Sequence, residues 1–305
     1  MLHYVLNRLA QAIVVLLGVS VVVFMLLHFT GDPAALLIPE DATVEQVAAF
    51  RHQMGFDQPL HVQYIRFLRD AICGDLGVSF RHRQPVISLV LERLPATYEL
   101  TIASALLSLV IALPIGVFSA VRRNTVWDRT AMAAAVLGQA MPVFWLGLMM
   151  IIIFGIWLDI LPISGRETWQ HLVLPAVTLA TYFVARNARL MRSSMLEVLG
   201  QDYVTTARAK GLSERTVIWK HAFRNSLISV ITLVGVEFGT MLGGAVITET
   251  VFAWPGVGRL TVQAIYNRDF PLVQGSVLIL AATLVVINLI IDLSYLYLDP
   301  RIKYS

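Results

Sequence analysis

The sequence predicts an all-α membrane protein with six transmembrane helices and one large basic loop on the cytoplasmic side. Hydrophobic residues make up 57% of the 305 residues, and the mean hydropathy is +0.72, whereas soluble proteins are about 45–50% apolar. Six runs approach the roughly 20 apolar residues that cross a bilayer. They lie at about 9–30, 98–121, 131–157, 172–191, 227–250 and 276–298.

The distribution of Lys and Arg predicts the orientation of these spans. An even number of spans places both termini on one side of the membrane. Fourteen of the 23 basic residues lie on that side, and six of the other nine lie in the long loop 31–97. Long loops count little in the positive-inside rule. We therefore expect both termini and the basic stretch 197–226 in the cytoplasm, and the loop 31–97 outside the cell.

Three parts follow from this pattern: the N-terminus with the first span (1–30), an extracytoplasmic loop (31–97), and a five-helix core (98–305) that includes the stretch 197–226. Helical spacing in the outer loop predicts two short helices, 44–54 and 62–72, separated by Gly55 and by the Asp57-Gln58-Pro59 turn signal.

No metal site is expected in this chain. His52, His61 and His82 lie in the outer loop, but their spacings fit no usual ligand pattern. Cys73 is the single cysteine, which excludes a cysteine-based metal cluster.

The basic stretch 197–226, EVLGQDYVTTARAKGLSERTVIWKHAFRNS, predicts a compact helical lobe of two short helices broken at a turn. Gly200 can end one helix, and Asp202 can cap the next. Gly211 can supply the left-handed residue that closes that helix, and Ser213 is placed to cap a third.

The same lobe carries apolar and aromatic residues that a merely solvated loop would not need. We expect them to be exposed, and docking into another protein would explain both their presence and the helix caps. They are Tyr203, Val204, Leu212, Val217, Ile218 and Trp219.

Two features inside the spans are candidates for a transport path. Pro142 and Pro114 interrupt helical hydrogen bonding and predict kinks, which shape helix packing or a path. Glu237 lies in the middle of the fifth span, where an ionised side chain costs about 2.5–3.5 kcal/mol or more. It must be protonated, paired or in contact with water, so it either lines a polar path or hydrogen-bonds to a neighbouring helix.

Small and basic residues predict how two of the spans pack. Gly235, Gly239 and Gly243 repeat every four residues in the fifth span, which would let another helix approach closely. The fourth span meets arginines after Ala185, and we expect its helix to continue while their side chains reach the membrane interface. There they could bind lipid phosphates or a partner. These arginines are Arg186, Arg189 and Arg192.

Motifs for catalysis are absent from the sequence. The three lysines, Lys210, Lys220 and Lys303, follow no G-x-x-x-x-G-K-[ST] loop, and neither H-E-x-x-H nor G-x-S-x-G occurs. The sequence therefore argues against an enzyme and predicts no cofactor. It favours a membrane bundle that works through a partner.

Segments along nearly the whole chain resemble the ABC-importer permeases of the dipeptide, oligopeptide and nickel group. The lobe is the most similar part, with Asp202-Tyr203-Val204, Thr206 to Leu212, and His221 to Asn225. Other matching segments are Gly31-Asp32-Pro33, Leu60 with Gln63-Tyr64, Gly74-Asp75-Leu76-Gly77, Leu94-Pro95-Ala96-Thr97, Leu174-Pro175-Ala176, Gly243-Gly244, Pro255-Gly256 with Gly258, Arg268-Asp269 and Asp299-Pro300-Arg301.

The resemblance implies a type I ABC-importer permease in the bacterial inner membrane, with the lobe as its coupling-helix loop. The general family pattern there is E-A-A, three residues and Gly; this sequence keeps Ala207 and Gly211 but has Thr205 and Thr206 before them. The residues implied to couple to the ATPase are Asp202, Tyr203, Thr206, Ala207, Arg208, Lys210, Gly211 and Leu212.

The resemblance also implies partners and a class of solute. The partners are a second similar permease, two ATP-binding subunits that hydrolyse ATP, and an extracytoplasmic solute-binding protein. Peptide uptake is favoured, because a bare-ion path would be expected to carry inward His, Met or carboxylate groups, and the spans show few. A nickel or metal-chelate importer of the same group and a non-transporting membrane scaffold are the alternatives.

Overall fold

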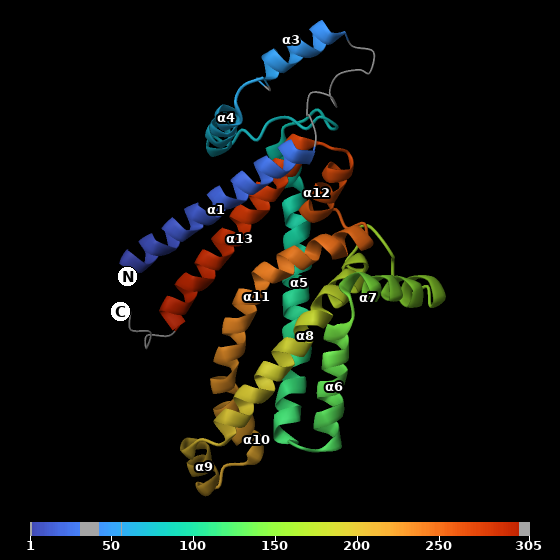
Figure 1. Cartoon of the computed structure of the whole chain (residues 1–305). Coiled ribbons are helices and arrows are strands. Elements are labelled where there is room, and N and C mark those ends of the chain that lie inside the picture. Colours follow the sequence, from blue (N-terminus) through green and yellow to red (C-terminus); the bar gives the residue numbers. More distant parts are fainter. Residues whose placement is uncertain (1, 31–42, 56, 299–305) are drawn as a thin grey trace. The chain divides into compact units, whose positions relative to one another are not determined.

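A computed structural model describes residues 2–30, 43–55 and 57–298 of the chain (Figure 1). These residues form helices and turns, with one isolated antiparallel bridge between Val78 and Pro85. The predicted all-α class is confirmed. The Gly31-Asp32-Pro33 and Asp299-Pro300-Arg301 segments lie outside the described residues.

The elements follow one another in this order: α1 Leu2–Thr30, α3 Val44–Met54, α4 Leu60–Ile72, α5 Val86–Val121, α6 Val126–Ala140, α7 Val143–Met150, the π-helix η1 Ile151–Trp157, α8 Gln170–Leu199, α9 Asp202–Ala209, α10 Glu214–Thr216, the π-helix η2 Val217–Ala222, α11 Phe223–Val251, α12 Val257–Tyr266 and α13 Phe270–Leu298.

Four helical segments among the described residues are long and apolar enough to cross a membrane. They are Leu6–Leu26, Val86–Val121, Glu214–Val251 and Phe270–Ile291, and a bent pair of helices would make a fifth span. The remaining predicted run, the fourth at 172–191, lies in α8. Its apolar part, between polar first residues and Arg186, is too short to meet the same standard of length and hydropathy.

The predicted third span, 131–157, is broken at Pro142, where the sequence predicts a kink. α6 and the α7–η1 helix form the bent pair, and they meet at an angle of 101°. Proline disfavours helical geometry in the residue before it, and Met141 accordingly has an extended backbone, with φ −77° and ψ 131°. Pro142 then occupies the N-cap position of α7. The expected kink is therefore a complete break in the helix.

The chain forms two compact units, which are described separately. Unit 1 comprises Met1–Pro95 and Gly256–Ile290, and unit 2 comprises Ala96–Pro255 and Ile291–Ser305. Segments distant in sequence share unit 1. The predicted division at residues 30 and 97 concerns membrane topology and stays a prediction.

Unit 1 contains the two short helices predicted for the outer loop. α3 begins with a capping box between Thr43 and Gln46 and ends at Gly55, which has a left-handed φ of 73°. α4 packs on α1. The hydroxyls of Ser20 in α1 and Tyr64 in α4 are 2.9 Å apart, and the Phe24 ring of α1 lies 5.4 Å from that of Tyr64. The prediction of these two helices is confirmed.

The core of unit 1 joins the beginning of α5 to α12 and α13. Val86 and Val90 from α5 are fully buried against Val257 and Leu272. Gly275 of α13 faces the Val86 side chain so closely that a Cβ at this position would overlap it. Burial of this apolar surface holds two segments together that are more than 160 residues apart in the sequence.

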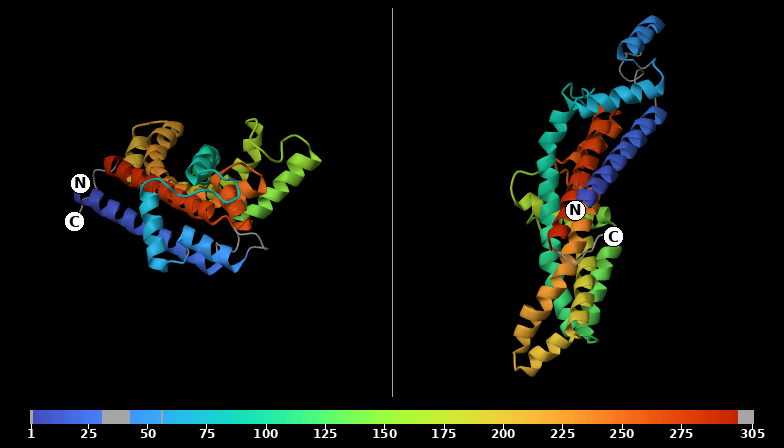
Figure 2. Two further views of the ribbon diagram at one scale, coloured as in Figure 1. Left: turned by 90° about the horizontal axis from the view of Figure 1, so that it is seen from above. Right: turned by 90° about the vertical axis from the view of Figure 1, so that its left-hand side faces the viewer.

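Unit 2 is organised around α8, which runs beside α6 and α11 (Figure 2, right). Its apolar residues meet those of α5 and α11 in a core that includes Leu100, Leu179 and Met241. Two buried hydrogen bonds accompany this core. The Trp254 Nε1–H donates to the Ala96 carbonyl at 2.8 Å, and the Thr97 hydroxyl donates to Glu249 at 2.7 Å.

Within unit 2, α5 approaches α8 closely at Gly116 of α5. A Cβ there would lie 2.5 Å from Met191 Cβ and 2.7 Å from the Ala188 carbonyl oxygen of α8. By contrast, Gly243 is exposed, and a Cβ there would meet nothing within 4 Å. Gly239 is buried in α11 and Gly235 is half-buried. A role of these three glycines in packing remains a prediction.

We expect Gly116→Ala to destabilise the purified chain by about 1–3 kcal/mol, because the added methyl group overpacks the contact between α5 and α8. Gly243→Ala is the matched control, since it adds the same atom in open space and should leave stability unchanged or slightly higher. Thermal unfolding in detergent measures both variants. Equal melting temperatures for the two would contradict the assignment of Gly116 to the close contact.

Candidate functional site

The basic stretch 197–226 forms a compact lobe at one end of unit 2 (Figure 1). It contains the end of α8, the eight-residue helix α9, a tight turn, and then α10 and η2 leading into α11. α9 contacts both α8 and η2. The lobe thus joins the ends of two long helices through one short helix.

Three of the four predicted caps in the lobe are confirmed. Gly200 is the C-cap residue of α8. Gly211 follows α9 with a φ of 78°, and the Leu212 N–H donates to the Ala207 carbonyl at 3.4 Å, which is the bond of a Schellman cap. The Ser213 hydroxyl accepts from the Thr216 N–H. The Asp202 cap is wrong: Gln201 is the N-cap residue and Asp202 is already helical, in the first turn of α9, where its charge favours the helix dipole.

The predicted third helix of the lobe is not a separate element. A continuous helix runs from Glu214 to Val251, and it includes the π-helical turns of η2. The arm that leaves α9 is therefore the first part of the transmembrane helix α11. A tight turn of four residues, 210–213, joins α9 to this helix.

Burial divides the apolar residues of the lobe into two groups. Val204 and Val217, which we expected to be exposed, are fully buried and pack with Ala207 against the end of α8. Tyr203, Leu212 and Trp219 are 41–48% exposed, as predicted. The buried group fastens α9 to the lobe, and the exposed group lies on the surface of the lobe.

The polar residues of the predicted coupling set lie on the exposed side of α9 and its turn. Asp202, Thr206, Arg208 and Lys210 are exposed, as are Gly211 and Leu212. Within the lobe, Arg208 pairs with Glu214 at 2.6 Å. The Asn225 side chain donates to the Tyr203 hydroxyl at 2.7 Å, which links the beginning of α9 to α11.

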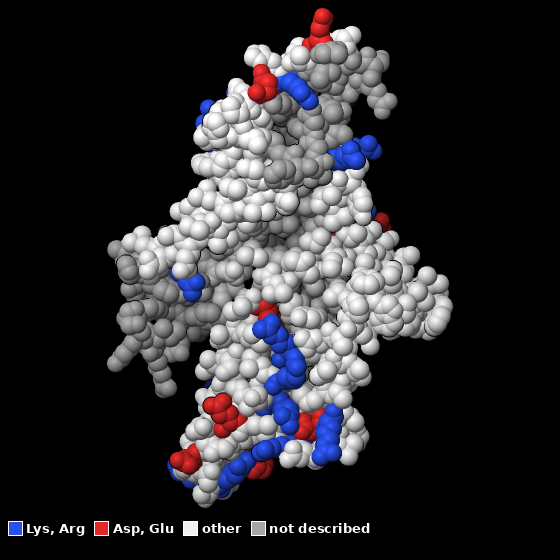
Figure 3. All heavy atoms as spheres, in the orientation of Figure 1, with Lys and Arg blue, Asp and Glu red and all other residues white. Residues whose placement is uncertain are grey.

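A series of arginines along α8 connects this helix to both neighbours. Arg186, Arg189 and Arg192 follow at three-residue intervals, so each is rotated by about 60° from the one before. Figure 3 shows basic side chains gathered along this face of unit 2. We call the three residues the arginine ladder. Each of the three contacts a neighbouring helix, and binding of lipid phosphates or of a partner by these arginines stays a prediction.

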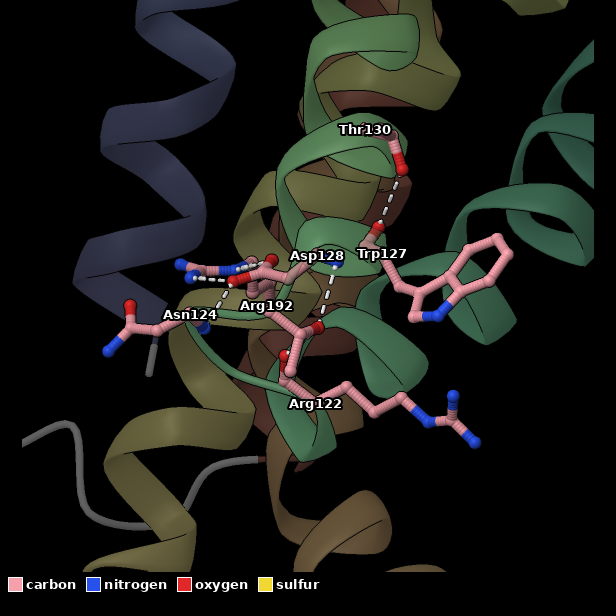
Figure 4. A network of polar contacts seen from close by, with 7 residues as sticks. Arg122, Asn124, Trp127, Asp128, Thr130 and Arg192 are labelled. Carbon is pink, nitrogen blue, oxygen red and sulfur yellow. Dashed lines mark hydrogen bonds and ion pairs between the residues drawn. The ribbon is translucent and has the colours of Figure 1, made fainter.

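The strongest contact of the ladder is a bidentate ion pair between Arg192 and Asp128 of α6 (Figure 4). Arg192 Nε donates to Oδ1 and Nη2 donates to Oδ2, each at 2.7 Å. The Asn124 N–H also donates to Oδ2 at 3.0 Å. The side chain of Asp128 is 4% exposed. This carboxylate therefore fixes the turn between α5 and α6 on α8.

Sequence reasoning missed Asp128, although a signal was present. Asp128 is three residues after Thr125, and the Asp128 N–H donates to the Thr125 hydroxyl as in a helix N-cap. A single carboxylate in an otherwise basic turn is a natural partner for an arginine at the same end of another span. Glu249 was also missed, and it is completely buried.

The other end of the ladder pairs with the mid-membrane Glu237. Arg186 Nε lies 3.2 Å from Glu237 Oε1; the Arg186 side chain is 45% exposed and that of Glu237 is 1% exposed. Arg189, between them, donates to Gln139 of α6 at 2.6 Å. Neither Glu237 oxygen nor the buried amide of Asn187 has a partner that meets hydrogen-bond geometry. Glu237 is therefore the buried member of the pair, and Arg186 is the accessible one.

Comparison with known proteins identifies the class defined by this bundle and lobe as transport permeases. Two family models together match nearly all of the chain. The binding-protein-dependent transport system inner membrane component matches residues 112–304, and the N-terminal membrane-component model matches residues 1–101. The chain belongs to this family and is a multi-pass inner-membrane permease of an ABC importer.

Curated relatives match over the full length of the chain. The glutathione transport system permease protein GsiC of Salmonella paratyphi A is 43% identical, and the alignment covers 100% of both chains. The GsiC protein of Escherichia coli K12 is 41% identical over the same coverage. The dipeptide transport system permease protein DppB of Alkalihalophilus pseudofirmus is 40% identical, again covering 100% of both chains.

A solved structure confirms the fold. The MetNI methionine ABC transporter in an inward-facing conformation matches with a TM-score of 0.58 and 20% identity, covering 72% of this chain and 98% of that chain. At this identity the likeness concerns the architecture of the helices and supports the type I importer class.

We expect Asp128→Ala to cost about 3–5 kcal/mol of stability, since it leaves a partly buried arginine without its counter-charge. Arg192→Met together with Asp128→Ala should recover part of the loss. A double-mutant cycle from denaturant unfolding in detergent would give a coupling energy of about 2–3 kcal/mol. Additive losses would show that the pair does not connect α6 with α8.

Proposed function

We propose that this chain forms, with a second similar permease, the path by which an ABC importer carries short peptides across the inner membrane. The observation that supports a peptide solute is the full-length similarity, near 40%, to permeases named for glutathione and dipeptide transport. Two ATP-binding subunits would supply the energy on the cytoplasmic side, and an extracytoplasmic binding protein would deliver the solute. The chain itself would not hydrolyse ATP.

The lobe is the proposed contact with an ATP-binding subunit. Its exposed residues Tyr203 and Leu212 offer an apolar contact surrounded by charged groups, which is the usual composition of a protein interface. Ala207 lies underneath, against Val217 at the beginning of the long helix. Movement of an ATP-binding subunit would therefore shift α9, and the rigid connection would tilt α8 and α11 together.

The proposed orientation follows from this contact. The lobe has to be cytoplasmic to meet an ATP-binding subunit, which agrees with the distribution of basic residues between the spans. Both termini would then lie in the cytoplasm and α3 and α4 outside. Cysteine accessibility at Cys73, which is exposed and would lie outside, tests this orientation with a membrane-impermeant thiol reagent: labelling of intact cells is expected, and labelling only after lysis would contradict it.

The polar pair of α8 and α11 is the proposed link between the bundle and the solute path. Glu237 is too buried to line a water-filled path directly in this conformation, whereas Arg186 is accessible. We therefore assign contact with the path to Arg186 and a counter-charge role to Glu237. Pro142 is exposed at the break between α6 and α7, where it can contribute to the same path.

We expect Ala207→Asp to uncouple ATP hydrolysis from uptake, because it places a charge in the apolar contact beneath α9. Ala207→Ser keeps a small uncharged side chain at the same buried position and serves as the control. With both variants inserted and assembled, the first should lose at least tenfold in ATP-driven uptake, while the second should lose less than twofold. Equal uptake by the two would contradict a role of the buried face in coupling.

Reconstitution of the permease with its partners in vesicles tests the transport function itself. We expect ATP-dependent uptake of glutathione or a labelled dipeptide, delivered by its binding protein, and a reduction of tenfold or more in Glu237→Gln, because Arg186 then lacks its counter-charge. Uptake of nickel or a metal chelate without peptide uptake would replace the proposed solute. Absence of any solute flux from the complete assembly would favour a membrane scaffold.

A further inference from the structure

Residues 78–85 form a tight hairpin in unit 1, between α4 and the beginning of α5 (Figure 1). Val78 and Pro85 make its antiparallel bridge. The Ser79 N–H donates to the Gln84 carbonyl at 2.9 Å, and the Arg83 N–H donates to the Ser79 carbonyl at 2.9 Å. We call this segment the outer hairpin.

A buried carboxylate anchors the outer hairpin from a distant part of the sequence. Asp269 is 1% exposed, and it accepts from the Ser79 hydroxyl at 2.5 Å, the Phe80 N–H at 3.2 Å and the Arg81 N–H at 3.1 Å. Hydrogen bonds to a charged group are stronger than neutral ones. One side chain therefore determines the position of three consecutive residues.

The same carboxylate caps α13. Asp269 precedes the first residue of that helix, and its Oδ1 accepts from the Leu272 N–H at 3.4 Å. A negative charge at a helix N-terminus is favoured by the helix dipole, which helps to compensate for the loss of water around it. The hairpin is thus fixed to the beginning of a transmembrane helix, so its tip and that helix move together.

The tip of the hairpin presents three consecutive basic residues on a backbone that these hydrogen bonds hold in place. Arg81, His82 and Arg83 are exposed, and residues 78–85 contain no acidic residue. Arg83 has a left-handed φ of 53°, and the His82 N–H donates to the Ser79 hydroxyl at 3.0 Å. A non-glycine residue keeps such a conformation only where its surroundings determine it.

We propose that the outer hairpin, held by Asp269, is a docking surface for an acidic patch on the extracytoplasmic solute-binding protein. This inference rests on the proposed function, which places unit 1 residues 43–85 outside the cell. A rigid array of charges is useful against a folded partner with fixed acidic groups, because preorganisation lowers the entropic cost of binding. A fluid lipid surface would gain little from it. Opposite charges would also accelerate the encounter with the partner.

The test measures the affinity of the purified binding protein for the assembled transporter in nanodiscs of zwitterionic lipid. Arg81→Glu with Arg83→Glu should weaken binding at least tenfold and reduce its dependence on salt. Asp269→Asn should weaken it several-fold although both arginines remain, because the carboxylate no longer holds the hairpin. Arg69→Glu on α4 is the control for charge, since Arg69 is exposed and pairs with its neighbour Asp70. The affinity of the binding protein for a transporter with this substitution should not change.

The outcomes separate this inference from the proposed function. Size-exclusion elution of each variant with its partners shows that the complex is assembled. If wild type imports peptide and binds its partner but the double Arg variant binds within twofold of wild type, the docking surface is overturned. The docking surface is also overturned if the double Arg variant changes only the binding to vesicles of anionic lipid. If wild type neither binds the partner nor imports peptide, the proposed function itself fails.

Discussion

Charges that lie between helices must find their counter-charges inside the protein, and this constraint organises unit 2. A bilayer offers little to solvate an ion, so an unpaired arginine or carboxylate there is expensive. The arginine ladder of α8 meets the constraint by contacting α6 at one end and α11 at the other. Apolar packing brings the helices together, but contacts between similar aliphatic side chains tolerate sliding. The bidentate Arg192–Asp128 pair has one geometry, and it therefore sets the register between α6 and α8.

Unit 1 also contains a buried charged group whose partners lie within the protein. Asp269 is buried at the beginning of α13, where it serves both the helix and the hairpin before α5. In unit 2 the lobe is connected by apolar contacts beneath α9 and by a helix that continues into α11. Each unit thus has a short surface element rigidly attached to a long helix. The proposed transmission of a partner's movement to the spans rests on this arrangement.

Several corrections have one cause, which is that periodicity and composition describe a residue without its neighbours. Val204 and Val217 are apolar in a charged stretch, so they could be exposed for a partner or buried beneath α9; their burial depends on where α8 ends. Pro142 predicted a kink, but the size of the bend depends on what α7 packs against, since proline removes one hydrogen bond without specifying a direction. Asp202 has the residue type of a cap, yet the backbone of Gln201 adopts the extended conformation that a cap requires.

The sequence by itself determined the all-α membrane class, the two helices of the outer loop, the break at Gly211 and the family, because these depend on local hydropathy, local backbone preference and motifs. The tertiary structure alone decided which charges meet: Asp128 with Arg192, Glu237 with Arg186, and Asp269 with the hairpin at Ser79. These partners are 51 to 190 residues apart in the sequence. Such pairs follow from the packing of whole helices, and the sequence shows each charge without the partner that packing supplies.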